Sequence, residues 1–293
     1  MFKIKQSSNI QNEIKVIMIG KSGNGKSSTG NTLLGYKDFT VARSLNAVTE
    51  QCHMETRFLR NGQRIKVVDT PGLFDAGNTL GGRALEILKA VEKCPNPNAF
   101  LLVLNPSRFT EEELCTVEVI RIIFGKEIFE HMCIVFTHGS EFQDREEFRK
   151  FWEESEYVRD LVKRCNGRVF KIENKNQNRY EDEDFLNLID TIQSCPEYKY
   201  RYLGEHQAAL KEHQDKYTSE NKDIKSQIED LDVRLSRRID PKIWKERLIT
   251  GVAIVGSVAA TGVAVFVAPK AVAKTALGLG CGFVGYSMNK LSK

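Results

Sequence analysis

Short apolar runs alternate with longer amphipathic segments over most of the chain. Five of the apolar runs each predict a buried strand: 15–19, 65–68, 99–104, 133–137 and 168–172. Four further segments predict helices: 27–34, 110–125, 142–165 and 185–192. Strands that alternate with helices are typical of an α/β domain whose mostly parallel central sheet is flanked by helices.

Local turn and capping signals refine this pattern. Residues 51–59 alternate between apolar and polar positions and are followed by Asn61-Gly62, a strong hairpin signal. The sheet is therefore expected to carry one antiparallel edge strand. Thr110 and Glu113 have the spacing of a capping box, which predicts the start of a helix.

After Pro196 the pattern changes to a repeat of seven residues. One set of positions in this repeat is apolar or aromatic throughout: Leu203, Leu210, Tyr217, Ile224 and Leu231. The second set is apolar only in its last two members: Gln207, Gln214, Asn221, Ile228 and Leu235. Residues 197–240 are therefore expected to form either a coiled coil or an amphipathic helical extension that packs back on the domain.

Residues 248–268 carry no charge and are long enough to span the core of a bilayer as a helix. The basic residues before this segment exceed those after Met288, so the positive-inside rule leaves the preceding domain on the cytosolic side. We therefore expect residues 241–293 to be a basic linker and a membrane anchor, either one span or a hairpin that includes 271–288. The alternative is a helical hairpin buried against the domain.

Composition adds three constraints. Of the 293 residues, 28% are charged and 41% are hydrophobic, as in ordinary globular proteins. The net charge of +4 is too small to indicate a nucleic-acid partner, and none is expected. The seven scattered cysteines show no metal-binding or disulfide spacing, so free thiols in a reducing compartment are expected. We divide the chain into an N-terminal arm (1–13), the α/β domain (14–196), the helical extension (197–240) and the tail (241–293).

The segment after the first predicted strand has the chemistry of a phosphate-binding loop. Residues 20–27 read GKSGNGKS, which fits G-x-x-x-x-G-K-[ST] between a strand and a helix. Glycines let consecutive backbone N–H groups turn toward phosphate at the positive end of the helix dipole. Lys26 is expected to reach the β- and γ-phosphates, and Ser27 to bind Mg²⁺. The predicted phosphate-binding residues are Gly20, Lys21, Ser22, Gly23, Asn24, Gly25, Lys26, Ser27, Ser28 and Gly72.

A second element is expected to hold the metal ion. The sequence Asp69-Thr70-Pro71-Gly72 fits D-x-x-G, in which the Asp orients a water on Mg²⁺ and the Gly N–H senses the γ-phosphate. A switch threonine between the two loops would coordinate Mg²⁺ in the triphosphate state. Thr40 and Thr49 are both candidates by position.

Several motifs, in this order, resemble the AIG1-type G domain of the GTPases of immunity-associated proteins, the GIMAP family. The matching stretches are MIGKSGNGKSSTGNTLLG, VTEQC, VVDTPGLFD, and CPNPNAFLLVLNPSRFTEEE before IFG. The resemblance covers about residues 14–195 and implies a Ras-like P-loop fold, GTP or GDP with Mg²⁺, and action at intracellular membranes in immune, stress or cell-survival regulation. It selects Thr49 as the switch threonine, so the implied metal set is Ser27, Thr49 and Asp69. Septins and the chloroplast import-receptor GTPases are relatives of this family.

The guanine-reading motif departs from the usual [NT]-K-x-D. The fourth motif reads THGSE, and Ser140 stands where the guanine-binding Asp is expected. Either Glu141 takes this role, or Glu173 accepts hydrogen bonds from N1 and N2 of the base while Asn174 bonds O6. The second arrangement resembles that of the import-receptor GTPases and is favoured, with His138 against the face of the base.

Leu73 occupies the position at which Ras-like enzymes carry the water-orienting Gln. We therefore expect slow GTP hydrolysis unless a partner surface or a second copy of the chain assists, with Arg43, Arg83 and His53 as candidate residues. Three functions stay open. They are a membrane-anchored GTP switch that forms GTP-dependent dimers or oligomers, a nucleotide-stabilised membrane scaffold with negligible turnover, and an ATP-using P-loop enzyme.

Overall fold

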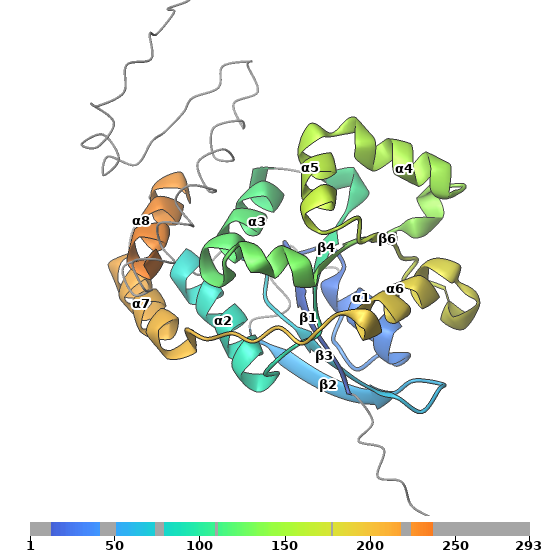
Figure 1. The fold of residues 1–293 in the computed structure, drawn as a ribbon, viewed down its shortest axis with the longest axis horizontal. Coiled ribbons are helices and arrows are strands. Elements are labelled where there is room, and N and C mark those ends of the chain that lie inside the picture. Colours follow the sequence, from blue (N-terminus) through green and yellow to red (C-terminus); the bar gives the residue numbers. More distant parts are fainter. Residues whose placement is uncertain are drawn as a thin grey trace, which may run out of the picture. The chain divides into compact units, whose positions relative to one another are not determined.

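A six-stranded sheet with the strand order β2-β3-β1-β4-β5-β6 forms the centre of the computed structural model (Figure 1). The model describes residues 13–41, 51–73, 79–108, 111–176, 178–217 and 224–236, which all fall within one compact unit of the chain, 1–244. The strands are β1 (Ile14–Ile19), β2 (His53–Phe58), β3 (Arg64–Asp69), β4 (Ala99–Leu104), β5 (Met132–Phe136) and β6 (Val169–Lys171). Strand β2 pairs antiparallel with β3, and the other neighbours pair in parallel. The predicted α/β architecture with one antiparallel edge strand is confirmed.

Eight α-helices surround the sheet within the described residues. They are α1 (Lys26–Leu34), α2 (Leu80–Lys93), α3 (Glu111–Phe124), α4 (Arg145–Glu154), α5 (Glu156–Arg164), α6 (Glu183–Ser194), α7 (Leu203–Lys216) and α8 (Ile224–Ser236). Short 3₁₀ turns cover Pro106–Arg108, Lys126–His131, Gly139–Glu141 and Arg179–Glu181. Alternate residues of each central strand enter different cores, because side chains of a strand point to opposite faces. Ile17 and Ile19 of β1 belong to the core that contains residues of α2, α3, α4, α5, α7 and α8, whereas Val16 and Met18 belong to the core that contains residues of α1 and α6.

Two helical segments differ from the sequence-based expectation. The hydrophobic pattern does not predict α2, which begins after Thr79, whose side chain accepts a hydrogen bond from the Gly82 N–H. The segment 142–165 forms two helices instead of one, because Ser155 ends α4 and its hydroxyl caps α5 by accepting from the Val158 N–H.

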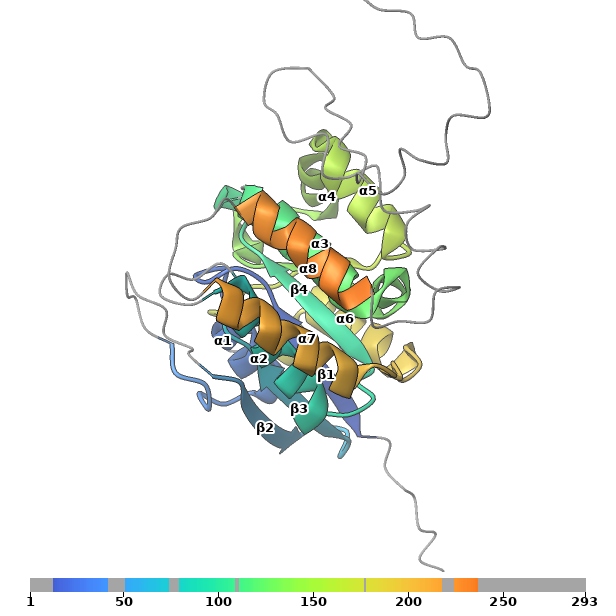
Figure 2. The same cartoon turned by 90° about the vertical axis from the view of Figure 1, so that its left-hand side faces the viewer.

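Helices α7 and α8 lie side by side and pack back against α2 and α3 (Figure 2). Leu210, Leu231 and Leu235 are each at most 1% exposed and join the core on that face of the sheet. Gly81 allows the close approach of α7, since a Cβ at this position would lie 2.8 Å from both His213 Nδ1 and the Gln214 nitrogen. Within the described residues, the repeat of seven residues therefore lies on two helices that pack against the domain.

The predicted membrane segment, 248–268, lies outside the described residues. Within the described residues, none of the helices is both long enough and apolar enough to cross a bilayer. The six cysteines in this part of the chain are free thiols, as expected, and Cys281 lies outside it.

Candidate functional site

The predicted phosphate-binding loop connects β1 to α1 at the carboxyl edge of the parallel strands. Gly25 adopts a left-handed conformation (φ 96°) at the N-terminus of α1, and no side chain caps the helix there. Gly20 passes so close to β4 that a Cβ would lie 2.5 Å from the Val103 carbonyl oxygen. Lys26 is the first residue of α1, and its Nζ donates to the Lys21 carbonyl oxygen at 3.0 Å. The loop therefore curls around a lysine ammonium group at a helix N-terminus, where an anion is stabilised.

The predicted metal-binding residues Ser27 and Asp69 lie in direct contact. Strands β1 and β3 are neighbours, with Met18 opposite Asp69, so the two loops leave the same edge of the sheet. The Ser27 hydroxyl donates to Asp69 Oδ2 at 2.5 Å, and Asp69 is 2% exposed. A hydroxyl and a carboxylate are hard oxygen donors of the kind that binds Mg²⁺ together with phosphate oxygens. Thr49 lies outside the described residues.

Asn24 fixes the underside of the loop to three other elements. Its side chain is 1% exposed and points into the domain, where Nδ2 donates to the Val103 carbonyl oxygen at 3.1 Å and to Glu113 Oε1 at 3.3 Å. The Thr137 hydroxyl donates to the Asn24 carbonyl oxygen at 3.1 Å. The motif predicts Asn24 only as a position of the phosphate-binding loop, because a sequence pattern does not indicate that its side chain faces α3.

The predicted base-reading residues gather around Glu173. Its Oε2 accepts from the Ser140 hydroxyl at 2.6 Å and from the Ser140 N–H at 3.3 Å, while Oε1 accepts from the Lys175 N–H at 2.9 Å. Burial alone would raise the pKa of the Glu173 carboxyl, but the hydrogen bonds from Ser140 and Lys175 lower it below its ordinary value. The hydrogen bonds from Ser140, at the position of the usual Asp, and from Lys175 thus favour the ionised form of the Glu173 carboxyl.

Of the other candidates for binding the base, Asn174 is held in place by α1, whereas His138 and Glu141 are exposed. Asn174 is tied to α1, since its Oδ1 accepts from the Thr32 hydroxyl at 2.9 Å and its Nδ2 donates to the Thr29 hydroxyl at 3.2 Å. His138 has a left-handed backbone (φ 59°), and its Nδ1 lies 4.0 Å from Glu141 Oε1. The side chains of His138 and Glu141 are about half exposed, so the anchored carboxylate beside Ser140 belongs to Glu173 rather than to Glu141.

The candidates for catalysis are dispersed among the described residues. Leu73 is 2% exposed and belongs to the hydrophobic core, which leaves no side chain there to orient water. Arg83 is 5% exposed within α2, and His53 is exposed at the start of the edge strand β2. Arg43 lies outside the described residues. Thr40 is exposed in the segment that follows α1.

Comparisons with known proteins find relatives of this chain. The model of the AIG1 family matches residues 14–222. The chain is 33% identical over 185 residues to immune-associated nucleotide-binding protein 12 of Arabidopsis thaliana, covering 60% of this chain and 47% of that protein. It is 30% identical over 182 residues to GTPase IMAP family member 8 of Mus musculus, covering 61% of this chain and 26% of that protein. The chain thus spans about half or less of the length of these relatives.

A solved structure with a similar fold is that of a dimerization-deficient variant of Toc33 from Arabidopsis thaliana. It has 24% sequence identity and a TM-score of 0.50, and the match covers 64% of this chain and 88% of that chain. This likeness shows the fold, and the predicted Ras-like P-loop class is confirmed.

Proposed function

The chain belongs to the AIG1 family, as its motifs predict, and on that premise we propose that it is a guanine-nucleotide-binding switch. The nucleotide is GTP or GDP, and the metal is Mg²⁺. The observation that carries this function is the contact between Ser27 and Asp69 beside the loop that curls around Lys26. Ser27 and Asp69 would hold the metal against the phosphates, with Thr49 as the third expected residue.

Guanine selectivity rests on Glu173. The side chain and the N–H of Ser140 hold its carboxylate ionised next to Asn174, and an ionised carboxylate accepts hydrogen bonds from the N1 and N2 donors of guanine. Adenine has no such pair of N–H donors, so it would leave the Glu173 carboxylate without hydrogen bonds from the base. A site built to bond such groups rejects the analogue that lacks them by as much as ~10⁴-fold.

Hydrolysis by one copy of the chain is slow in this proposal, because the Leu73 side chain lies in the core. Acceleration comes from a second copy, and the existence of a dimerization-deficient form of the similarly folded Toc33 supports an assembly of this kind. A scaffold with negligible turnover is the second candidate, which the absence of a water-orienting side chain at Leu73 favours. GTP turnover measured against protein concentration separates the two, because a dimer-dependent enzyme gains specific activity with concentration.

The proposed place of action is the cytosolic face of an intracellular membrane. The uncharged segment 248–268 supports this proposal, because its length matches the hydrocarbon core of a bilayer. The domains proposed for the chain keep the boundaries of the sequence analysis: an arm (1–13), the G domain (14–196), the helical extension (197–240) and the anchor region (241–293).

The phosphate-binding assignment is tested with fluorescent GDP. Lys26→Ala should abolish binding while the circular dichroism spectrum stays unchanged, because the ammonium group is lost from the centre of the loop. Lys150→Ala on α4, where the side chain is 70% exposed, is the matched control and should bind as the unmodified protein does. Unchanged GDP affinity in Lys26→Ala would refute the assignment.

Base reading is tested by competition between GTP and ATP. The unmodified protein should prefer GTP strongly, and Glu173→Ala should lose this preference, while Glu141→Ala should keep it. Equal competition by ATP in the unmodified protein would favour the ATP-using alternative. Loss of preference in Glu141→Ala alone would move the role to Glu141.

A further inference from the structure

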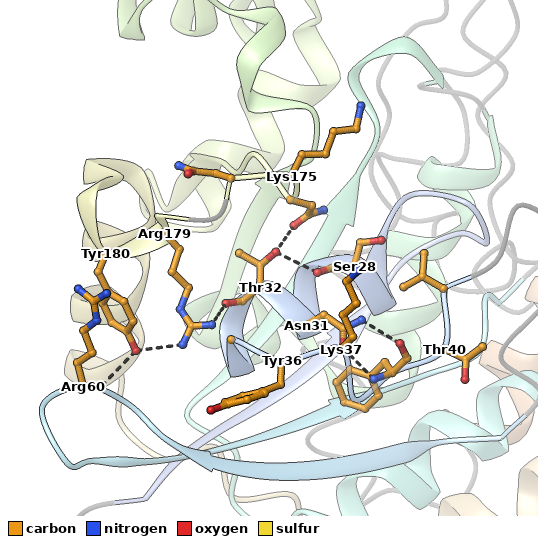
Figure 3. Close-up of a pocket in the computed structure, with 15 residues that line it drawn as sticks. Ser28, Asn31, Thr32, Tyr36, Lys37, Thr40, Arg60, Lys175, Arg179 and Tyr180 are labelled. Atoms are coloured by element: carbon orange, nitrogen blue, oxygen red, sulfur yellow. Dashed lines mark hydrogen bonds between the residues drawn. The ribbon is translucent and has the colours of Figure 1, made fainter.

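A groove of about 1240 Å³ runs along the outer side of α1 (Figure 3). Its described walls come from α1, from residues 36, 37 and 39–41, from residues 174–176, 179 and 180, and from Arg60 at the tip of the β2–β3 hairpin. Four of its lining residues are cationic: Lys37, Arg60, Lys175 and Arg179. None of the 15 described residues that line the groove is an aspartate or glutamate, so the groove is suited to an anionic ligand.

One end of the groove is rigidly organised around Tyr180. The guanidinium groups of Arg60 and Arg179 lie over its ring, with their central carbons 4.4 and 4.7 Å from the ring centre. The Tyr180 hydroxyl accepts from the Arg60 backbone N–H at 3.2 Å and from Arg179 Nη2 of the guanidinium group at 3.0 Å. Arg179 Nη1 also donates to the Thr32 carbonyl oxygen at 2.7 Å, which fixes this end of the groove to α1.

Two of the cations are not neutralised by the domain itself. Among the described residues, neither Lys37 nor Arg60 has a carboxylate within ion-pair distance, whereas Arg57 on the same hairpin pairs with Asp38 at 2.7 Å. Both side chains line the groove, where they can meet a ligand without breaking an existing ion pair.

The groove meets the proposed nucleotide site at the position of the sugar. This step rests on the proposed function, in which the phosphates lie at Lys26 and the base lies at Glu173. The ribose must then lie between them, beside Ser28 and Asn174, and both of these residues also line the groove. The 2′- and 3′-hydroxyls are the substituents of the nucleotide that can extend into it.

We propose that this groove binds phosphate carried on the 2′- or 3′-hydroxyl of a bound guanine nucleotide. Guanine nucleotides phosphorylated on the ribose are therefore the ligand class that the site prefers over GDP. Partly exposed cations bind free phosphate weakly, because water and salt screen them. A phosphate attached to an already bound nucleotide is presented at a high effective concentration, which makes the same contacts effective. Arginine adds paired N–H donors that match phosphate oxygens.

The test compares GDP with guanosine 5′-diphosphate 3′-diphosphate in the full-length protein by competition against fluorescent GDP. At low salt the 3′-diphosphate should bind about tenfold more tightly than GDP, since each of a few exposed cations contributes a factor of about two. The double variant Lys37→Gln with Arg60→Gln should reduce the ratio of the two affinities to about two to three, because two of these factors of about two are lost. Arg64→Gln is the matched control, an arginine of the same hairpin outside the groove that pairs with Glu13, and it should keep the ratio.

The result that overturns this proposal is a ratio near one in the unmodified protein, or a ratio that survives in the double variant. If the protein binds GDP and the 3′-diphosphate with equal affinity, the proposed role of the groove is contradicted and the proposed nucleotide site is not. Failure of GDP itself to bind would contradict the proposed function instead, so the two failures are distinguishable.

Discussion

Asn24→Ala should weaken both the fold and nucleotide retention, because it removes the side chain that ties the phosphate-binding loop to β4 and α3. The Asn24 amide donates to the Val103 carbonyl oxygen at 3.1 Å and to the buried carboxylate of Glu113 at 3.3 Å. Glu113 is itself only 1% exposed, so water cannot simply replace the lost donor. The loop backbone on either side of Asn24 is the part that is expected to surround the phosphates.

The magnitude follows from the two partners. A hydrogen bond to a neutral carbonyl contributes about 1 kcal/mol to stability, and one to a charged group contributes about 1.5–3 kcal/mol. Asn24→Ala should therefore lower the free energy of unfolding by about 2.5–4 kcal/mol. The coupling energy between Asn24→Ala and Glu113→Ala should be about 1.5–3 kcal/mol, because only the second bond joins these two residues. Domains of ordinary stability, about 5–15 kcal/mol, tolerate such a loss and stay folded.

The assay combines urea unfolding of both single variants and the double variant with the dissociation rate of fluorescent GDP. Asn98→Ala is the matched control, since the Asn98 side chain also makes two hydrogen bonds, in its case both to backbone groups. It accepts from the Lys15 N–H at 2.8 Å and donates to the Cys195 carbonyl oxygen at 3.3 Å. Asn98 precedes β4 at the opposite end of the sheet, so Asn98→Ala should lower stability without changing GDP dissociation, whereas Asn24→Ala should accelerate it. Additivity of Asn24→Ala and Glu113→Ala within about 0.5 kcal/mol would refute the reasoning.

Three further outcomes are expected. Burial lowers the pKa of His213 below its ordinary value of 6.5, so the unfolded chain binds the proton at a higher pH than the folded domain does. The free energy of unfolding should therefore fall as the pH drops below about 6.5. Urea unfolding of His213→Gln should show a smaller dependence on pH. Leu73→Gln should lower the melting temperature without raising GTP turnover, because the new amide would be buried in the core, and faster turnover would contradict this. Full-length protein should resist extraction from membranes by alkaline carbonate, and Val258→Arg with Ala259→Arg should release it, since each arginine at the centre of a span costs about 2.5–3.5 kcal/mol; a full-length chain that is monodisperse without detergent would contradict the anchor.

The strands and the phosphate-binding loop could be predicted because their signals are local. An apolar run followed by a glycine-rich loop and a helix defines β1, the loop and α1 within about twenty residues of sequence. Helix α2 could not be predicted in this way, because Gly81 and Gly82 occupy its first turn and lower the helix propensity of that segment. The reason for Gly81 is the close passage of α7, a contact between segments far apart in the sequence.

The candidate base-reading site shows the same limit. The spacing of motifs indicates that Ser140 departs from the usual Asp, and the resemblance brings in Glu173 as a replacement. The hydrogen bond between these two residues joins the ends of β5 and β6, so it depends on the pairing of those strands. The contact of Asn24 with Glu113 likewise depends on how α3 packs over the loop, which no local pattern encodes.

The central position of β1 in the sheet affects when the phosphate-binding loop can fold during synthesis. The phosphate-binding loop leaves the ribosome early, but the groups that fix it follow much later, at Val103 on β4, Glu113 on α3 and Thr137 after β5. Contacts between such distant segments form slowly, because a long loop must close before each one contributes. A nascent chain that ends before β4 therefore contains the whole loop sequence but none of these supports. The bound nucleotide then stabilises only the completed domain, so nucleotide binding by a nascent chain would indicate that β1, β4 and β5 have paired.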